Sequence, residues 1–312
     1  MILSSQTQRD PRDAYEALTF GLAKTVLYLF EPNRDVAAGL KLALREGGLT
    51  TTRSFANPAE LLLQLQQNPP DAVILSENAD HNIFELAKQV RHGEIGRNPF
   101  TVLSMLVSET KIASRDLAVR SGVDAILIKP VQMERIKEQL IRLGRQRLPF
   151  IATTDYIGPE RRTNNDRPSA IPQIKVVNTL QYRLEGRQIA QHLIDQAVTQ
   201  CMAQVWESQL QSAILKFHYI CKTVAAYLDD QAAIKKRAEL IDSFASTVSL
   251  TASIGRKLGK ASLSQMSQSI LVDIAEPEAR KGDVHSEHVA TLRKATLQLA
   301  EAIAACTTAG KK

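Results

Sequence analysis

The sequence of 312 residues contains few cysteines, few aromatic residues and no long apolar run. Its three cysteines, Cys201, Cys221 and Cys306, are odd in number and widely spaced, which indicates buried free thiols rather than disulfides or a cysteine-based metal site. Aromatic residues make up only 5% of the chain and do not interleave with a block of Lys and Arg, so the composition gives no support to nucleic-acid binding. We expect neither a metal nor a cofactor.

No apolar stretch approaches the roughly 20 residues needed to cross a bilayer. The N-terminal stretch MILSSQTQRDPRD lacks the basic-then-apolar order of a secretory signal. A length of 312 residues is enough for about two domains. For a chain of this length, a net charge of +6 is only mildly basic. We therefore expect a cytoplasmic protein that does not associate with membranes.

Apolar strand-like runs alternate with amphipathic helical stretches between residues 24 and 147. The expected strands are TVLYLF (25–30), LTTTRSFA (49–56), AVILS (72–76), TVLSML (101–106) and AILIKP (125–130). The expected helices are 34–46, 57–68, 83–91, 111–122 and 133–147. Because the connections are short and the strands are continuously apolar, this order predicts an α/β domain with a doubly wound, five-stranded parallel sheet. In such folds the ligand site lies at the carboxyl ends of the strands.

Composition and periodicity divide the chain into four regions. Residues 1–23 are expected to form an N-terminal extension that is partly helical, and residues 24–147 form the α/β domain. In 148–177 proline, glycine and arginine recur without periodicity, which predicts an extended linker. In 178–312 apolar residues recur every three to four positions over many turns, which predicts an all-α bundle of four or five helices and leaves homodimerisation open.

Three short motifs lie at the strand ends of the α/β region. LYLFEPN spans the end of the first expected strand, DAVILS contains the third, and GVDAILIKP contains the fifth. In this order and spacing, residues 25–147 resemble the receiver domain of two-component response regulators, which has a CheY-like (flavodoxin-like) fold. In that family a metal-binding acidic pair follows the first strand, the phosphoacceptor aspartate ends the third, a Ser or Thr ends the fourth, and Lys-Pro ends the fifth. The resemblance implies a corresponding site here made of Glu31, Pro32, Ser76, Ser108, Ile126, Lys129 and Pro130.

This site departs from the family's pattern at three positions. Ser76 stands at the phosphoacceptor position, and its hydroxyl cannot form the acyl phosphate that a carboxylate forms. Pro32 removes the second acid of the pair, so that Glu31 alone offers Mg²⁺ too few oxygen ligands. Ile126 replaces the switch aromatic of the fifth strand. We therefore expect a receiver that does not take phosphate, in which Ser76 is hydrogen-bonded at the strand end and Lys129 is a cation near Glu31. Modification of Ser76 by some kinase stays open.

The resemblance also implies how a protein partner would bind. Receivers dock partners chiefly through the face made by the fourth helix, the fifth strand and the fifth helix, here 111–121, 125–129 and 133–145. The basic residues expected on this face are Arg115, Arg120, Arg135 and Lys137. A basic face suits an acidic protein partner, so we expect a signalling protein rather than a nucleic acid to bind there.

The predicted linker carries a resemblance of its own. Its stretch DYIGPERR (155–162) resembles a segment that follows the receiver in some alphaproteobacterial response regulators. Ile157, Gly158 and Pro159 predict a turn. We expect Arg161 and Arg162 to pair with acids of the receiver or of a partner.

The helical region offers weaker candidates for function. His192 and His218 lack the Lys-Gly step that follows the histidine of a phosphotransfer domain. His285 and His288 lie three residues apart, a spacing that suits two metal ligands, but no further ligand cluster is near. The basic, glycine-broken stretch 254–266 is the best candidate for nucleic-acid contact, although a corner between two helices is the preferred interpretation.

The sequence contains no nucleophile elbow, P-loop or dinucleotide fingerprint, so we expect no enzyme activity. We interpret the chain as a response-regulator-like signalling protein that acts as a phosphorylation-independent protein-interaction module. Two alternatives stay open: a nucleic-acid-binding regulator that uses the C-terminal helices, and a conventional phosphorelay receiver or phosphotransfer protein.

Overall fold

The computed structural model describes residues 20–78, 82–108, 112–162, 171–274 and 284–308. The chain divides into two compact units. The first is made of Met1–Phe150, Tyr156–Asp166 and Gln173–Cys201, and the second of Ile151–Asp155, Arg167–Pro172 and Met202–Lys312. Of the N-terminal extension predicted for 1–23, only the residues from 20 onward are described, and these are helical.

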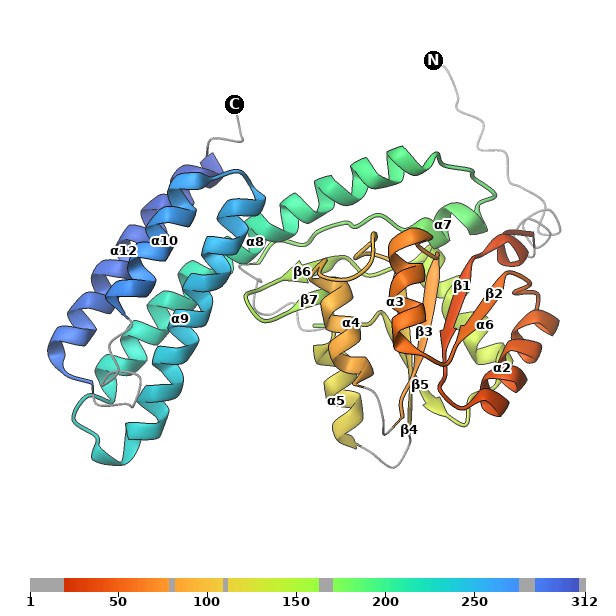
Figure 1. The fold of residues 1–312 in the computed structure, drawn as a ribbon, viewed down its shortest axis with the longest axis horizontal. Coiled ribbons are helices and arrows are strands. Elements are labelled where there is room, and N and C mark those ends of the chain that lie inside the picture. The colour runs from red at the N-terminus through yellow and green to blue at the C-terminus, as the bar shows by residue number, and fades with distance from the viewer. Residues whose placement is uncertain (1–19, 79–81, 109–111, 163–170, 275–283, 309–312) are drawn as a thin grey trace, which may run out of the picture. The chain divides into compact units, whose positions relative to one another are not determined.

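A five-stranded parallel sheet lies in the middle of the first unit (Figure 1). Its strands are β1 (Leu27–Phe30), β2 (Thr52–Phe55), β3 (Ala72–Ser76), β4 (Val102–Ser108) and β5 (Ala125–Lys129). Their order in the sheet is β2-β1-β3-β4-β5, and every neighbouring pair is parallel. This is the order found in flavodoxin and in CheY. The predicted α/β fold class with a doubly wound, five-stranded sheet is therefore confirmed.

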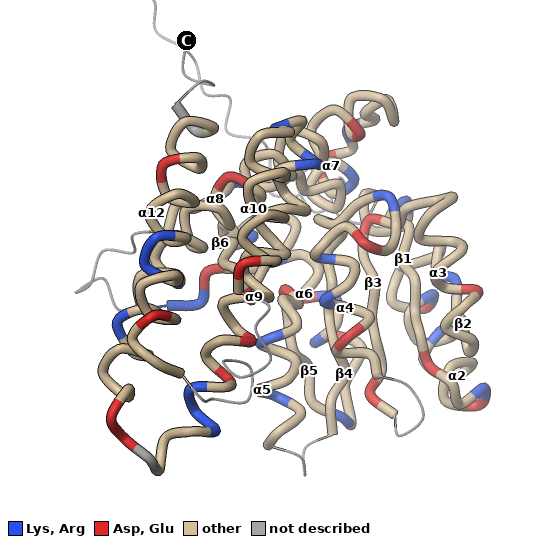
Figure 2. The backbone as a smooth tube through the Cα atoms, turned by 60° about the vertical axis from the view of Figure 1, so that its left-hand side comes forward, with Lys and Arg blue, Asp and Glu red and all other residues tan. Residues whose placement is uncertain are grey.

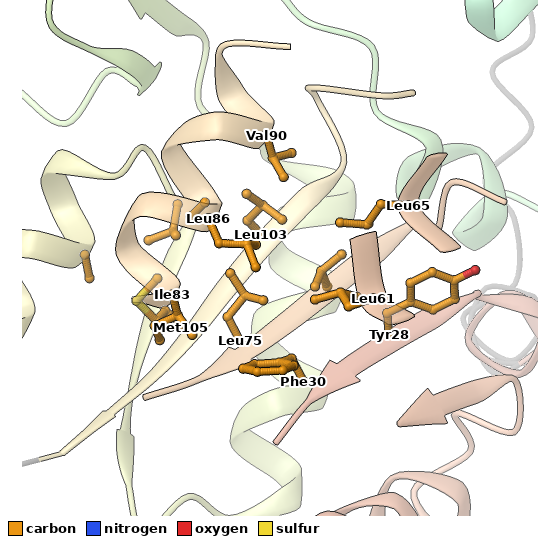
Figure 3. Packing of buried hydrophobic residues seen from close by; sticks show 14 of the residues in the cluster. Tyr28, Phe30, Leu61, Leu65, Leu75, Ile83, Leu86, Val90, Leu103 and Met105 are labelled. Atoms are coloured by element: carbon orange, nitrogen blue, oxygen red, sulfur yellow. The ribbon is translucent and has the colours of Figure 1, made fainter. Parts of the chain in front are cut away.

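Helices cover both faces of this sheet. One face packs against α3 (Pro58–Gln67), α4 (Ile83–Arg91) and α5 (Ile112–Arg120), and the other against α2 (Arg34–Glu46) and α6 (Met133–Arg145). Successive side chains of a strand point to opposite faces, so a continuously apolar strand supplies both cores. In β3, for example, Leu75 packs with Leu61 and Leu86 on the first face (Figure 3), while Ile74 belongs to the core of the second.

Asparagine side chains mark where three of these helices begin. The Asn33 side chain accepts hydrogen bonds from two backbone N–H groups at the start of α2, and Asn82 caps α4 in the same way with one. Asn57 caps α3 and is followed by Pro58 at the first helical position, where the missing N–H has no cost. Asn33 and Asn57 lie shortly after the ends of β1 and β2, so these caps fix where α2 and α3 begin.

The segment predicted as an extended linker packs against the first unit along part of its length. It contains β6 (Phe150–Ala152) and β7 (Ile157–Pro159). Phe150 and Ile174 exchange two backbone hydrogen bonds of 2.8 and 2.7 Å, and both side chains are buried. Gly122 (φ +77°) leaves room for this segment, since a Cβ there would lie 2.1 Å from the carbonyl oxygen of Ile157. Single apolar residues therefore anchor parts of a segment whose sequence shows no periodicity.

Two buried arginines and one aspartate join this segment to the sheet. Arg91 Nη2 lies 2.7 Å from Asp124 Oδ2, and Arg147 Nε lies 2.8 Å from Asp124 Oδ1. The Phe150 ring lies beside both cations, with its centroid 5.1 Å from Cζ of Arg91 and 4.9 Å from Cζ of Arg147. Arg91 also donates to the backbone carbonyl of Gly122 at 2.8 Å. We refer to Arg91, Asp124, Arg147 and Phe150 as the anchor cluster.

The short helix α7 (Thr179–Leu184) also belongs to the first unit. Leu180 and Leu184 are buried in the same core as α6, where Gly144 leaves the space that Leu184 fills. Arg183 Nε lies 3.0 Å from Asp71 Oδ2, just before β3. The region predicted as an all-α bundle from residue 178 therefore begins with a helix that completes the α/β unit.

The second unit is helical. Its helices are the part of α8 (Gln191–Ala226) from Met202 onward, the short 3₁₀ helix η1 (Gln231–Ala233), α9 (Ile234–Lys257), α10 (Ala261–Asp273) and α12 (Ser286–Thr308). Among the described residues, Phe217 of α8, Phe244 of α9, Ile270 of α10 and Leu299 of α12 share one core, and the two phenylalanine rings lie 4.8 Å apart. The predicted helical C-terminal region is confirmed. None of the described helices combines the length and the apolar character that a membrane crossing requires.

Candidate functional site

The residues predicted from the receiver resemblance lie at the carboxyl ends of the strands. Glu31 follows β1, while Ser76, Ser108 and Lys129 are the last residues of β3, β4 and β5. The strand register brings Ser108 directly beside Lys129. The parallel sheet therefore gathers these side chains at one edge, as the fold predicts.

A hydrogen bond between Ser76 and Glu31 forms the middle of this site. The Ser76 hydroxyl donates to Glu31 Oε2, and Lys129 Nζ lies 3.7 Å from the same oxygen. The other carboxylate oxygen, Glu31 Oε1, accepts the backbone N–H of Asn33 at 3.0 Å. Both oxygens of the Glu31 carboxylate thus have partners within the protein.

The burial of this pair limits its chemistry. A carboxylate next to a serine hydroxyl could act as its general base and make it a nucleophile. Ser76, however, has an exposed fraction of 0% and Glu31 one of 5%, so a phosphoryl donor has no access to the hydroxyl. Pro32 contributes no side-chain oxygen beside Glu31. Among the described residues, no three His, Cys, Asp or Glu side chains are grouped so that they could hold a metal ion.

Lys129 is held between the ends of two strands. Its Nζ donates a 2.9 Å hydrogen bond to the carbonyl oxygen of Glu77, in addition to its contact with Glu31. The Lys129–Pro130 peptide bond is cis, and Pro130 is exposed. Ile126, three residues before Lys129 on β5, is half-buried and packs against the core of the first face.

Glu77 is a functional candidate that the sequence did not reveal. Its carboxylate accepts hydrogen bonds from the backbone N–H of Ser108 at 2.8 Å and from the hydroxyl of Ser114 at 2.5 Å. The bond to Ser108 joins β3 to β4, and the bond to Ser114 joins β3 to α5. In the sequence, the only signal for Glu77 is its position one residue after the third strand. Sequence patterns do not predict the direction of a side chain in a loop.

The basic residues predicted for partner docking are mostly exposed. Arg115, Arg120 and Arg135 are exposed, and Lys137 is half-buried. Figure 2 marks the charged residues along α5 and α6. The sequence did not predict that α5 would also expose apolar side chains, with Ile112 77%, Leu117 47% and Val119 37% exposed. We refer to Ile112, Arg115, Leu117, Val119 and Arg120 as the α5 face.

The two arginines of DYIGPERR have different surroundings. The Arg161 guanidinium donates to the carbonyl oxygen of Val123, so it is paired within the protein, with a backbone carbonyl of the first unit. Tyr156 lies beside it, and burial raises the pKa of the Tyr156 hydroxyl although Arg161 lowers it in part. Arg162 is exposed, and its backbone N–H donates to the Glu160 side chain at 2.9 Å.

The histidines of the helical region have local roles. His288 Nδ1 accepts the backbone N–H of His285 at 2.9 Å at the start of α12, which is the geometry of a helix cap. His218 is exposed, and its Nδ1 lies 2.8 Å from the carbonyl oxygen of Ile214 one turn earlier. The stretch 254–266 contains the end of α9 and the start of α10, so it is a corner between two helices.

Comparison with known proteins adds little to this description. No protein-family model matches the sequence, and no curated protein matches it. Among solved structures, the chain is similar to the chemotaxis protein CheY4 of Vibrio cholerae, with 22% sequence identity, 37% of this chain and 95% of that chain covered, and a TM-score of 0.33. The doubly wound, flavodoxin-like fold of the first unit is established by its own strand order and by the helices on both faces of its sheet.

Proposed function

We propose that this protein is a response-regulator-like signalling protein whose first unit binds a protein partner without being phosphorylated. The observation that carries the proposal is the buried hydrogen bond between Ser76 and Glu31. Ser76 stands where the resemblance places the phosphoacceptor, and its hydroxyl already has a partner. Because these side chains satisfy one another's hydrogen bonds, the site keeps this conformation without a phosphoryl group.

The chemistry of the site supports this proposal. Formation of an acyl phosphate requires an ionised carboxylate as nucleophile and a divalent cation to neutralise the phosphoryl group. Ser76 supplies no carboxylate. Glu31, which would be the metal ligand, accepts hydrogen bonds from Ser76 and from the backbone N–H of Asn33. Mg²⁺ would have to displace both.

The α5 face supports a protein as the partner. Three of its five side chains are apolar and exposed, which is typical of a surface that another protein covers. Two arginines and the exposed Asp116 lie among them, and the neighbouring helix α6 carries three arginines, one lysine and two glutamates, so both helices have a small excess of positive charge. A partner with an acidic rim and an apolar centre suits this combination.

A labelling experiment tests the first part of the proposal. The full-length protein is incubated with Mg²⁺ and labelled acetyl phosphate beside a conventional receiver. We expect label on the conventional receiver and none on this protein. Label that appears on this chain and disappears in the Ser76→Ala variant would overturn the proposal.

A binding experiment tests the second part. Full-length protein is used to capture a partner with and without acetyl phosphate, in the wild type and in the Leu117→Glu and Leu63→Glu variants. Leu63 on α3 is a matched control because it is 54% exposed, close to the 47% of Leu117. We expect the same partner to be retained under both conditions and by Leu63→Glu, and to be lost from Leu117→Glu. Binding that requires acetyl phosphate would contradict the proposal.

A further inference from the structure

The carboxylate of Glu77 connects three elements at the edge of the candidate site. Its oxygens accept the N–H of Ser108 at the end of β4 and the hydroxyl of Ser114 in the first turn of α5. Its own backbone N–H donates to the carbonyl oxygen of Leu106 at 2.8 Å, and its carbonyl oxygen accepts from Lys129 at 2.9 Å. Glu77 is thus bonded at the backbone to β4 and β5, and at the side chain to β4 and α5.

Among the described residues, the helix α5 buries only small side chains. Ser114 and Ala118 are its buried residues, and both are small, so the helix contributes little apolar area to the core. Its larger apolar residues, Ile112, Leu117 and Val119, are exposed. Hydrogen bonds to a carboxylate are stronger than those between neutral groups. The bond from Ser114 to Glu77 therefore helps to position the first turn of α5.

We propose that Glu77 is a built-in anion that holds the α5 face in one conformation without any phosphoryl group. Two donors, the Ser108 N–H and the Ser114 hydroxyl, converge on one place at the carboxyl edge of the sheet. A carboxylate of the same chain fills that place permanently. This inference rests on the proposed function in one respect, since it takes the α5 face to be the surface that a partner reads.

Hydrogen exchange of the full-length protein tests the inference. We compare the wild type with Glu77→Ala and with Glu60→Ala, a control that removes an exposed glutamate from α3. In Glu77→Ala we expect amides of 112–120 to exchange about tenfold faster, the scale of one lost charge-assisted hydrogen bond. In the same Glu77→Ala variant, the amides of 58–67 in α3 should keep their wild-type exchange rates. Unchanged exchange of 112–120 in Glu77→Ala would overturn the inference.

A double-mutant cycle guards against a variant that does not fold. Ser114→Ala removes one donor and leaves the Glu77 carboxylate with the Ser108 N–H. If the two residues act through their mutual bond, the free energies of unfolding of Glu77→Ala, Ser114→Ala and the double variant will be less than additive. Additive changes would overturn the inference. If Glu77→Ala does not fold, faster exchange of 112–120 in Ser114→Ala supports it, and wild-type exchange there overturns it.

These outcomes are separate from the test of the proposed function. Label from acetyl phosphate on the wild type would overturn the proposal that the protein acts without phosphorylation. The exchange rates of 112–120 in Glu77→Ala would still report whether Glu77 holds α5. Conversely, wild-type exchange rates in Glu77→Ala would overturn the inference that Glu77 holds α5, and the labelling result would still decide the proposed function.

Discussion

Ser76 shows how one side chain changes the chemistry at a strand end. Its hydroxyl is small enough to be enclosed at the end of β3, and Glu31, which follows β1, accepts a hydrogen bond from it. A buried hydroxyl without a partner costs free energy, whereas one bonded to a carboxylate contributes to stability. The buried hydrogen bond therefore gives Ser76 a structural role that does not depend on any ligand.

A pair of serine variants measures this role. Removing the hydroxyl in Ser76→Ala leaves Glu31 with one donor fewer, and we expect the free energy of unfolding to fall by about 1–2 kcal/mol in urea titrations. Ser104 on β4 is the matched control, because its hydroxyl is equally buried but has no hydrogen-bond partner among the described residues. Ser104→Ala should change the free energy by less than about 0.5 kcal/mol or increase it. Equal losses in the two variants would contradict the role of the Ser76–Glu31 bond.

The sequence predicted the positions of the site residues better than their contacts. The strand runs placed Glu31, Ser76 and Lys129 at the same edge, because parallel strands align their carboxyl ends. The hydrogen bond from the Asn33 N–H to Glu31, and the turn of Glu77 toward α5, depend on loop conformation. Hydrophobic periodicity carries no information about loops, so Glu77 could not be found from it.

At the scale of elements, the anchor cluster joins the last residue of α4, the residue before β5, the segment after α6 and the first residue of β6. Burial by itself would raise the pKa of Asp124, but the charges of Arg147 and Arg91 outweigh it and hold that pKa below its usual value. Burial lowers the pKa of Arg91 to about 10, so that Arg91 is charged at neutral pH. Two cations thus share one buried anion, and each of the three depends on the others.

The variant Asp124→Asn tests this arrangement. It keeps the shape of the side chain but leaves two buried guanidinium groups without a counter-charge, and we expect a loss of about 3–5 kcal/mol in the free energy of unfolding at pH 7. Because the folded pKa of Asp124 is depressed, its contribution is fully present above the unfolded pKa of about 4 and is lost as the pH falls through the folded pKa. In urea titrations, the difference in the free energy of unfolding between wild type and variant should therefore be the same at pH 7 and pH 5 and smaller at pH 3. A gap that widens on acidification would contradict the buried ion pairs.

The elements that the sequence predicted correctly are those with a clear period. Five apolar runs and five amphipathic stretches each became a strand or a helix of the first unit. The strands β6 and β7 have three residues each and α7 has six, which is too short for a period to show. Their places are set by single residues such as Phe150 and Leu180, whose partners lie far away in the sequence.

At the scale of the whole molecule, buried contacts place the end of the α/β unit beyond the end of the family resemblance. The resemblance to a receiver ends at residue 147, yet buried apolar groups and an ion pair continue beyond it. Leu180 and Leu184 complete a core that α6 shares, and Arg183 pairs with Asp71. The stable unit is therefore longer than the segment that carries the family resemblance.

Three fragments test this extension. A fragment of residues 1–150 lacks β7 and α7, a fragment of 1–190 keeps both, and a fragment of 1–201 adds the start of α8. Burial of Leu180 and Leu184 alone is worth about 3–6 kcal/mol, so we expect 1–150 to unfold at a much lower urea concentration than 1–201. The fragment 1–190 should match 1–201 closely, because the exposed pair of Arg97 and Asp195 contributes little. Equal urea midpoints for 1–150 and 1–201 would show that the receiver-like core is complete at residue 150, and that the segment after it adds contacts without adding stability.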